Sequence, residues 1–495
     1  MMRRDEVDNL VKALSAIAGA QNVSNAEDVL SSFAEDASFE KRMMPRAVVR
    51  PQNAEQVQQI IKWANETKTP LVPVSSAAPH AKGDTVPGAP EAVIVDLSGM
   101  KKILGISRRH RIAVIEPGVT YDELNAALAK EGMSVSMPLA PRAGKSVIGS
   151  ILETEPRLNA LHQWCNLDPL RCVEVTWGDG NRMYTGEAGG SVMDLEAQWK
   201  DDKWQWEPAG PMMLDFYRLL TGAQGTMGIV TWASVRCEIL PQAHKGFLVP
   251  AERLEDLIDF SYQVLRLRFG EEFFIMNAAQ LSRLVTHSAV EAEKLEATLP
   301  RWAAIVGVAG REILPEERVA CHEQDIADIA QQHGLSLERA TGGITGDLAL
   351  KCANHATGAA SWKTNAAGAF ADIFFSTTLD RTPEFVRAMD SVAKESAYLR
   401  RVGVYLQPEN MGTSYHCSFT LPYDPQDEKE TARTQRLFGA ASERFSQMGA
   451  YYFRPYGIWS RLQLNRDAQS YKTLLELRKI FDPNGIMNPG KMRND

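Results

Sequence analysis

The sequence predicts an α+β protein with more than one domain. Its 495 residues are enough to form two or more hydrophobic cores. Strand-like and helix-like segments alternate from Val49 to Lys130, which is typical of a layered α+β or α/β architecture. The character of the chain changes near Pro241, where a different set of helical patterns and apolar runs begins. These observations indicate a first domain up to that point and a second α+β domain after it.

The first half divides into elements by its hydrophobic periodicity. Residues 1–48 are predicted to be helical, and Leu10, Leu14 and Ile17 recur at helical spacing. The next elements are expected in this order: a helix over 55–65, strands over 71–74, 92–97 and 112–115, a helix over 121–130, a β-hairpin over 172–190 and a strand entered from 222–228. Residues 191–217, rich in tryptophan and charge, are expected to form an excursion over the surface.

The second half is predicted to mix helices and strands without internal repeats. Helical patterns cover 251–269, 319–333 and 383–399, and apolar strand-like runs cover 302–308, 370–376, 402–406 and 416–421. The chain then ends in a helix from about 474, which stops at Asp482-Pro483.

Composition argues against several classes of protein. The net charge is −8 and Lys and Arg do not cluster, so a nucleic-acid partner is not expected. No stretch reaches the roughly 18 apolar residues of a membrane span, and the N-terminus lacks the apolar run of a signal peptide. The six cysteines form no CxxC pair, which argues against a zinc site or an iron–sulfur cluster. We therefore expect a cytoplasmic protein with no membrane span and no metal site.

The stretch Leu71–Pro87 is the most informative part of the first domain. An apolar strand opens into a loop of small side chains, Ser75-Ser76-Ala77-Ala78, and a second strand follows. Such a loop allows backbone N–H groups to approach a large anion such as a pyrophosphate. A tight turn without a ligand is the alternative interpretation.

Three motifs resemble one family of flavoproteins. They are the segment Val49–Pro73 with the strands that follow it, the pattern G-x-x-G-T-x-G-I-V-T at 222–231, and D-P-x-x-I-x-x-P-G-K at 482–491. Together they resemble the vanillyl-alcohol oxidase / p-cresol methylhydroxylase superfamily over about half of the chain. The resemblance implies an FAD-binding domain in two parts, 1–241 and 445–495, and a substrate-binding cap domain over 242–444.

The resemblance also implies which residues bind FAD. In the first loop they are Val74, Ser75, Ser76, Ala77, Ala78, Pro79 and His80. In the second small-residue loop, over 137–156, they are Pro138, Gly144, Gly149 and Ser150, and further along the chain they are Gly225, Gly228, Ile229, Asn488 and Lys491. Relatives with a covalent flavin place a histidine four residues before the closing glycine, where this chain has Pro79. His80 is only three residues before Gly83, so non-covalent FAD is expected.

Candidate catalytic residues come from three places. Arg454 follows Tyr451 and Tyr452, and an arginine beside tyrosines suits an oxyanion or a carboxylate. Relatives place the tyrosine directly before the arginine, whereas Phe453 intervenes here, so either tyrosine or neither could face the site. His416 is predicted to share a strand face with Ser414 and Ser418, as a substrate or proton-transfer group or as a structural histidine. Lys491 could stabilise the anionic reduced flavin.

The function that these expectations describe is FAD-dependent oxidation of a small molecule by hydride transfer to flavin. The substrate is expected to be a para-substituted phenol or a 2-hydroxy acid. Relatives that act on 2-hydroxy acids often carry H-x-G-D-G-N-x-H, which this chain lacks, so no metal is predicted. Oxygen or a separate electron-acceptor protein or subunit would take the electrons, and a homodimer or hetero-oligomer is expected. The alternative is a flavin-poor structural or binding subunit of a larger oxidoreductase, since Ser and Ala replace the glycines of the phosphate loop.

Overall fold

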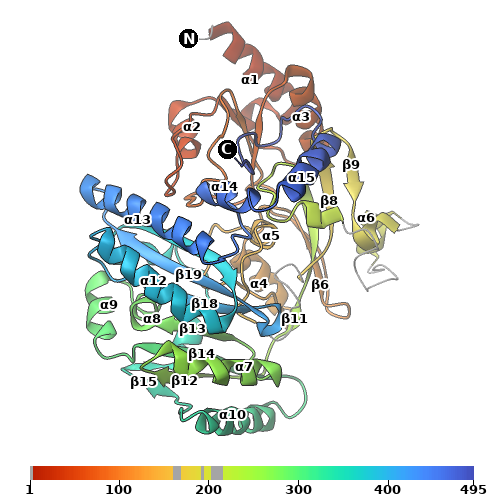
Figure 1. Cartoon of the computed structure of the whole chain (residues 1–495). Helices are drawn as coiled ribbons and strands as arrows, with labels where there is room; N and C mark the ends of the chain where they lie inside the picture. Colours follow the sequence, from red (N-terminus) through yellow and green to blue (C-terminus); the bar gives the residue numbers. More distant parts are fainter. Residues whose placement is uncertain (1–3, 160–168, 191–193, 202–215, 495) are drawn as a thin grey trace.

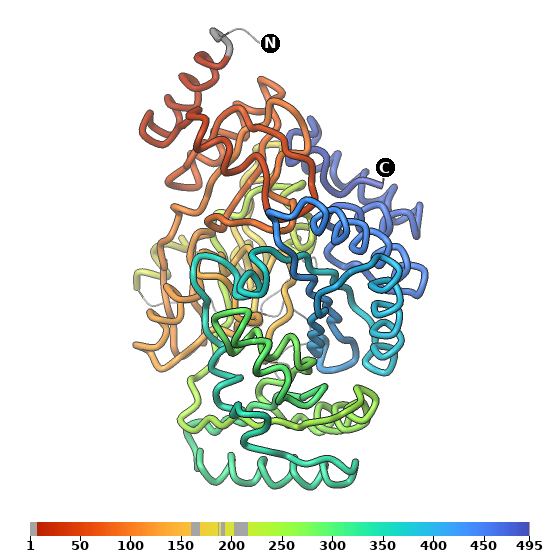
Figure 2. The backbone as a smooth tube through the Cα atoms, turned by 90° about the vertical axis from the view of Figure 1, so that its left-hand side faces the viewer, coloured from red at the N-terminus to blue at the C-terminus, as the bar shows by residue number. Residues whose placement is uncertain are grey.

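The computed structural model describes residues 4–159, 169–190, 194–201 and 216–494. Figure 1 shows the N-terminal third and the C-terminal helices in the upper part of the molecule, with a large sheet and its helices below. The turned view in Figure 2 agrees: the blue C-terminal segment lies beside the red and orange N-terminal segment. The predicted excursion over 191–217 falls largely outside the described residues.

The first sheet contains the small-residue loop and has the strand order β1-β2-β4-β3. Its strands are β1 Val23–Ser24, β2 Ala47–Val49, β3 Leu71–Val74 and β4 Val93–Asp96. Helices α1 Arg4–Ala18 and α3 Ala54–Thr67 pack apolar faces onto it, and α2 Glu27–Ala34 covers the other side. Because β3 and β4 both run parallel to the strands beside them, the loop after β3 opens at the carboxyl end of the sheet.

The second sheet is antiparallel and has the order β5-β6-β10-β8-β9. Its strands are β5 Ile103–Ser107, β6 Ile112–Ile115, β8 Leu170–Trp177, β9 Arg182–Tyr184 and β10 Gly228–Arg236. Helix α4 Tyr121–Ala129 packs on it, with Thr120 and Glu123 forming a capping box. Helix α5 Val147–Leu152 belongs to the second small-residue loop, and the short strands β7 Met133–Ser134 and β11 Glu238–Ile239 pair below it.

The third sheet is the largest, with the order β12-β14-β13-β18-β19-β17, and every pair of neighbours is antiparallel. Its strands are β12 Ala243–Ala251, β13 Phe273–Asn277, β14 Trp302–Gly310, β17 Ala369–Thr377, β18 Gly403–Glu409 and β19 Ser414–Tyr423. A small hairpin, β15 Ala340–Thr341 and β16 Ile344–Thr345, lies at its edge. These strands all fall within the predicted cap, and the boundaries at 241/242 and 444/445 stay predictions.

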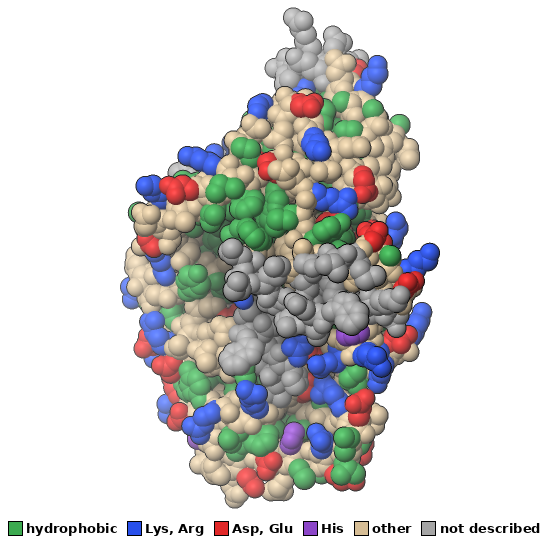
Figure 3. All heavy atoms as spheres, turned by 90° about the vertical axis from the view of Figure 1, so that its right-hand side faces the viewer, with side chains coloured by type: hydrophobic (Ala, Val, Ile, Leu, Met, Phe, Trp, Pro, Cys, Tyr) green, Lys and Arg blue, Asp and Glu red, His purple; other side chains and the backbone are tan. Residues whose placement is uncertain are grey.

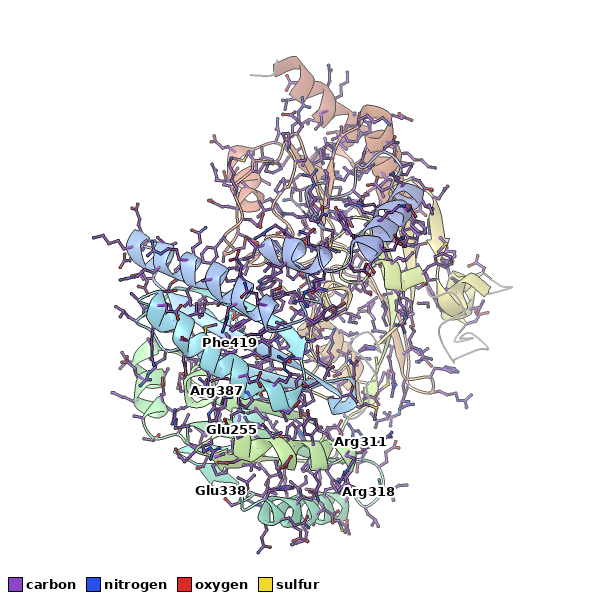
Figure 4. All side chains as sticks on the ribbon, viewed as in Figure 1. Glu255, Arg311, Arg318, Glu338, Arg387 and Phe419 are labelled. Atoms are coloured by element: carbon purple, nitrogen blue, oxygen red, sulfur yellow. The ribbon has the colours of Figure 1, made fainter. Side chains whose placement is uncertain are left out.

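Helices cover both faces of this third sheet. One face packs against α7 Ile258–Arg266, α10 Pro315–Gln332, α12 Thr382–Glu395 and α13 Glu428–Gln447. Phe419, labelled in Figure 4, lies on this side, with its ring 5.2 Å from that of Phe445 in α13. The opposite face packs against α8 Ala278–Val285 and α11 Gly346–Ala353, with α9 Ala289–Glu296 beside them. On that opposite face α8 and the 3-10 helix Trp362–Ala366 cover one end of β18, β19 and β17, and the other end remains open toward the first domain.

The C-terminal segment returns to the first domain through α14 Ile458–Leu464 and α15 Ala468–Phe481. After α15 the chain pairs with the first sheet, since Met487 forms a parallel bridge with Leu71. The Asp482 carboxylate accepts the N–H groups of Ile486 and Met487 at 3.0 Å, which fixes the turn after the helix.

Several element predictions need correction. Residues 1–48 contain two helices separated by β1, and not one continuous helical region. Residues 251–269 begin as the end of β12, and only Ile258–Arg266 is α-helical. The strands β12 and β13 and the helices α8, α9, α11 and α13 are absent from the predicted set.

Acidic and basic side chains are interspersed over much of the face in Figure 3. In the parts of the chain that the structure describes, no helix is long and apolar enough to cross a membrane.

Candidate active site

Two adjoining cavities border the first loop: the larger lies between the first domain and the third sheet, and the smaller lies within the first domain beside Tyr456. The larger has a volume of about 750 Å³ and the smaller about 120 Å³. Both are lined by Pro73, Ser75, Asp84, Glu153 and Tyr456, so the first loop borders both of them. The pair therefore forms an extended site that runs along the first loop, as a long cofactor requires.

The first loop is held in place by the second. Ala77 N donates to Gly144 O at 3.0 Å, and Ser146 N donates to the Ser76 hydroxyl at 3.1 Å. Val74, Ser75, Ser76, Pro79 and His80 line the larger cavity, whereas Ala77 and Ala78 do not. The loop thus presents small side chains and backbone to the site.

Glycines permit close approach around the smaller cavity. A Cβ at Gly149 would lie 2.7 Å from Ser75 Oγ, and a Cβ at Gly225 would lie 2.5 Å from Pro73 Cγ. Gly149, Gly225, Gly228 and Ile229 all line this cavity. Close approach by small residues fits the backbone contacts that an FAD pyrophosphate and adenine would need.

His80 is the one titratable loop residue predicted to bind the cofactor. Its Nε2 is buried and has no hydrogen-bond partner. Burial, reinforced by the Arg142 charge, lowers the pKa of His80 to about 4, so the imidazole is neutral at pH 7. An unpartnered buried nitrogen in the wall of the larger cavity fits a group that meets a ligand.

A buried cluster of charges in the wall of the larger cavity joins the two loops. Lys82 Nζ lies 2.5 Å from a Glu153 oxygen and 2.6 Å from a Glu155 oxygen, and Lys145 Nζ lies 2.6 Å from Glu153. Although burial alone would raise it, Lys145 and Lys82 lower the pKa of Glu153 to about 2. Asp84 has the opposite environment: burial, with the Glu153 charge, raises the pKa of Asp84 to about 6.

Arg454 and His416 meet at the open face of the third sheet. Arg454 is 4% exposed, and its guanidinium carbon lies 3.9 Å from the centroid of the Phe374 ring. One guanidinium nitrogen lies 3.5 Å from His416 Nδ1, and Arg454 Nε is buried without a partner. Among the described residues no carboxylate forms an ion pair with Arg454. Burial, with the Arg454 charge, holds the pKa of His416 well below its ordinary value.

Strand alternation places His416 as the sequence predicts. His416 and Ser418 line the larger cavity, whereas Tyr415, Cys417 and Phe419 lie in the core on the opposite face.

The tyrosine predictions need correction. Tyr452 is fully buried, its hydroxyl donates to Ser442 O at 2.8 Å, and its ring stacks on Trp459. Tyr451 is 51% exposed and pairs through its backbone with Ser376. Neither lines a cavity. Tyr456, two residues after Arg454, lines both cavities and is the tyrosine of this segment that faces the site.

Three further predicted cofactor residues lie behind the cavity walls. Ser150 is fully buried and donates to Glu155 at 2.6 Å. Asn488 donates to Gln224 O at 2.7 Å and to Asp84 O at 3.1 Å, so it ties the C-terminal segment to the two cofactor segments. Lys491 is 7% exposed, with its ammonium 3.9 Å from a Glu40 carboxylate. Gly144 packs against Ala77, whereas Pro138 lines the larger cavity.

Several residues of the cavity were not predicted from the sequence. Residues 37–40, between α2 and β2, form part of its wall, as do Lys82, Asp84, Lys145, Glu153, Glu155, Lys363, Phe374 and Tyr405. Period-two alternation in 370–376 and 402–406 could have singled out Phe374 and Tyr405. The charged residues carry no such pattern. Among the described residues, no group of three or more His, Cys, Asp or Glu side chains could hold a metal ion.

Comparisons with known proteins agree with this geometry. Residues 45–156 match the model of an FAD binding domain. The chain is similar in structure to 4-ethylphenol oxidase from Gulosibacter chungangensis (TM-score 0.83, 17% identical, 99% of this chain and 98% of that one). It is also similar to p-cresol methylhydroxylase (TM-score 0.81, 20% identical, 99% and 97% covered).

The chain has the fold of 4-ethylphenol oxidase and p-cresol methylhydroxylase, and part of it matches an FAD binding domain. The predicted α+β fold, the FAD-binding domain and the cofactor FAD are thereby confirmed.

Similarity in sequence extends over nearly the whole chain. The D-2-hydroxyglutarate dehydrogenase of Stutzerimonas stutzeri is 24% identical over 511 residues, covering 98% of each chain. The 4-cresol dehydrogenase [hydroxylating] flavoprotein subunit of Pseudomonas putida is 22% identical over 533 residues, covering 98% of this chain and 95% of that protein. The predicted class, FAD-dependent oxidoreductase, is confirmed by these matches.

Proposed function

We propose that this flavoprotein oxidises a small para-substituted phenol and that the Arg454 guanidinium holds the phenolate oxygen. The observation that carries the proposal is a buried arginine that has no carboxylate partner among the described residues and stacks on an aromatic ring in the cavity wall. A buried cation without a hydrogen-bonded counter-ion is costly unless an anion joins it. Aromatic side chains line the rest of the larger cavity, namely Phe39, Trp362, Phe370, Phe374, Tyr405, Phe438, Tyr456 and Trp459.

Bound FAD would supply a ring that accepts a hydride from the substrate. The residues that would hold it border one or both of the cavities: Val74, Ser75, Ser76, Pro79, His80, Gly149, Gly225, Gly228 and Ile229. We propose that it is bound non-covalently, with His80 as the cavity residue at which a covalent link would form.

The protein's own side chains would handle the phenol proton. The Arg454 charge favours the phenolate form of a bound phenol. The neutral His416 orients the guanidinium through Nδ1. Asp84, with its pKa near 6, is ionised at pH 7 and able to take up a proton, and Tyr456 lines the same two cavities.

A 2-hydroxy acid is the second candidate substrate. The guanidinium suits a carboxylate as well as a phenolate, because its two parallel N–H donors match both carboxylate oxygens. A relative that covers the whole chain is named as a D-2-hydroxyglutarate dehydrogenase, which supports this alternative.

The proposal extends to partners. Because one relative is named as a flavoprotein subunit, we propose that a separate protein accepts the electrons, in a homodimer or hetero-oligomer in the cytoplasm.

The test is to add 4-ethylphenol or D-lactate to the purified yellow protein without oxygen and to follow the flavin absorbance. We expect the phenol to bleach the flavin and R454M to weaken phenol binding by at least about tenfold, the cost of losing a charge-assisted hydrogen bond. R387M is the control, since Arg387 is exposed and pairs with Glu255 on the outer face (Figure 4).

Bleaching by D-lactate alone would favour the second candidate. A colourless protein that cannot be reconstituted with FAD would overturn the enzyme and leave the flavin-poor subunit.

A further inference from the structure

The open face of the third sheet carries a second charged group at some distance from Arg454. The pairing of neighbouring strands places the side chains of this face in rows. One row across β18, β19 and β17 consists of Gln407, His416 and Ser376. Tyr405, Ser418 and Phe374 form the middle row, and Gly403, Thr420 and Asp372 form the third. The outer rows are four residues apart along β19, or about 14 Å at about 3.4 Å per residue.

Lys363 joins the third row. It lies on the 3-10 helix Trp362–Ala366, and its ammonium is 2.6 Å from Asp372 Oδ2. Both side chains are mostly buried, at 14% and 19% exposure, and both residues line the larger cavity. The ammonium also lies 5.7 Å from the Trp362 ring and 5.5 Å from the Phe370 ring, so aromatic contacts fix its position.

A polar network on the same face of the sheet, reaching to α8, holds this ion pair. The other Asp372 oxygen accepts from Thr420 Oγ1 at 2.6 Å, and Thr420 accepts from the fully buried Gln280 at 3.1 Å. Both carboxylate oxygens of Asp372 are therefore already hydrogen-bonded. Asp372 takes one of the three ammonium protons of Lys363, and no other described residue accepts from that nitrogen.

The fold alone does not require this arrangement. A buried ion pair seldom stabilises a protein more than apolar side chains of the same volume would. An ion pair held at the wall of a cavity, with donors to spare, is suited to a ligand. Because Asp372 offsets the Lys363 charge, the ligand group that fits is an oxygen acceptor and need not be charged.

We infer that Lys363, positioned by Asp372, is a second anchor that binds an oxygen on the para side chain of the substrate. This inference rests on the proposed phenol oxidation and narrows its substrate class. A phenol ring held at Arg454 covers only part of the distance between the outer rows. A side chain of a few carbons that ends in a hydroxyl, carbonyl or carboxylate oxygen would span the aromatic middle row of Phe374 and Tyr405 and reach Lys363.

The test compares two ligands that differ by one hydroxyl, 4-propylphenol and 3-(4-hydroxyphenyl)propan-1-ol. The apparent dissociation constant of each ligand comes from the dependence of the flavin reduction rate on ligand concentration, measured by rapid mixing with the holoenzyme under nitrogen. We expect the alcohol to bind about tenfold more tightly, as a hydrogen bond to a charged donor provides. K363M should abolish this preference and leave 4-propylphenol within about twofold of its wild-type affinity.

K351M is the matched control, because Lys351 is an exposed lysine on α11 of the same domain. The flavin content and spectrum of K363M report whether it has folded, and the comparison of the two ligands on the wild type needs no variant. Equal binding of both ligands to the wild type would overturn the inference and leave phenol oxidation standing. If K363M still binds the alcohol more tightly than 4-propylphenol, the inference is also overturned. If K363M loses affinity equally for both ligands, the inference is overturned as well, because Lys363 then contacts the ring or the flavin. If neither phenol perturbs the flavin, the proposed function itself fails.

Discussion

Tyr452 and Tyr456 lie in one short segment but have different surroundings. Tyr452 is packed in the core of the third sheet, where its hydroxyl is bonded to Ser442 O. Tyr456 borders both cavities, and Lys82 Nζ lies 5.7 Å from its ring centroid. The Tyr452 hydroxyl should therefore contribute to stability, and the Tyr456 hydroxyl to turnover.

Replacing each tyrosine with phenylalanine separates the effect on stability from the effect on turnover. Y452F leaves the Ser442 carbonyl without its donor in the core, so we expect a loss of about 1 kcal/mol in stability and near-normal turnover. Y456F should lower turnover of the phenol and leave the thermal midpoint nearly unchanged. Thermal unfolding and flavin reduction rates of both variants check this. A Y452F enzyme that folds normally but fails to reduce its flavin would restore Tyr452 as the catalytic tyrosine.

The lowered pKa of His80 predicts how the free energy of unfolding depends on pH. Its folded pKa of about 4 lies below the ordinary value of 6.5, so the unfolded chain binds a proton more readily between these values. The stability that neutral His80 contributes is complete above pH 6.5 and is lost as the pH falls toward 4. Between pH 7 and pH 5 the loss is about 2 kcal/mol.

The measurement is the thermal midpoint of the FAD-free protein at these two pH values. H80Q should lose less stability on acidification than the wild type. H287Q is the control, because His287 is exposed. Equal drops in the wild type and in H80Q would show that His80 is accessible to water.

At the scale of elements, periodic segments were predictable and context-dependent ones were not. The strand runs 302–308, 370–376 and 416–421 became β14, β17 and β19 because each buries alternate side chains against helices. The strand β12, AHKGFLVPA, was missed because charge and proline interrupt its pattern. The helix α13 was missed because most of its residues are polar and only a narrow stripe, including Leu437 and Phe445, is buried.

The site shows the same division. Alternation along β19 was enough to place His416 and Ser418 on one face. Whether Tyr452 or Tyr456 faces the cavity depends on a turn after Tyr451, which forms a β-bridge with Ser376. The periodicity of the sequence does not reveal such a turn. The Lys82–Glu153 and Lys363–Asp372 pairs join segments that only the tertiary fold brings together.

The entry into β10 gives a prediction about an element. Gly225 has φ +70°, and an added Cβ would lie 2.5 Å from Pro73 Cγ at the end of β3. G225A should separate these segments, with a cost of about 1–3 kcal/mol and a lower FAD content after purification. G99A is the control, because a Cβ at Gly99 would meet nothing within 4 Å. Flavin-to-protein absorbance ratios and thermal midpoints measure both effects, and a fully loaded, stable G225A would contradict the close approach.

At the scale of the whole molecule, the C-terminal segment is joined to the first domain at the cofactor site. Met487 pairs with Leu71, and Asn488 Nδ2 donates to carbonyls of Gln224 and Asp84, which belong to separate segments of the first domain. The Asn488 side chain is 1% exposed, so water cannot replace these bonds. The last residues of the chain therefore help to set the distance between the loops that line the two cavities.

N488A tests this joining of the C-terminal segment to the first domain. Two buried carbonyls would lose their donor, which should cost about 1–3 kcal/mol in stability and release FAD more readily on dilution. N484A is the matched control, because Asn484 lies in the same turn but is exposed, and its contact with Asn65 is at the surface. The measurements are the thermal midpoint and the rate of flavin loss in gel filtration. If N488A keeps its flavin as well as N484A does, the spacing of the loops is set by the sheets alone, and the C-terminal segment only covers them.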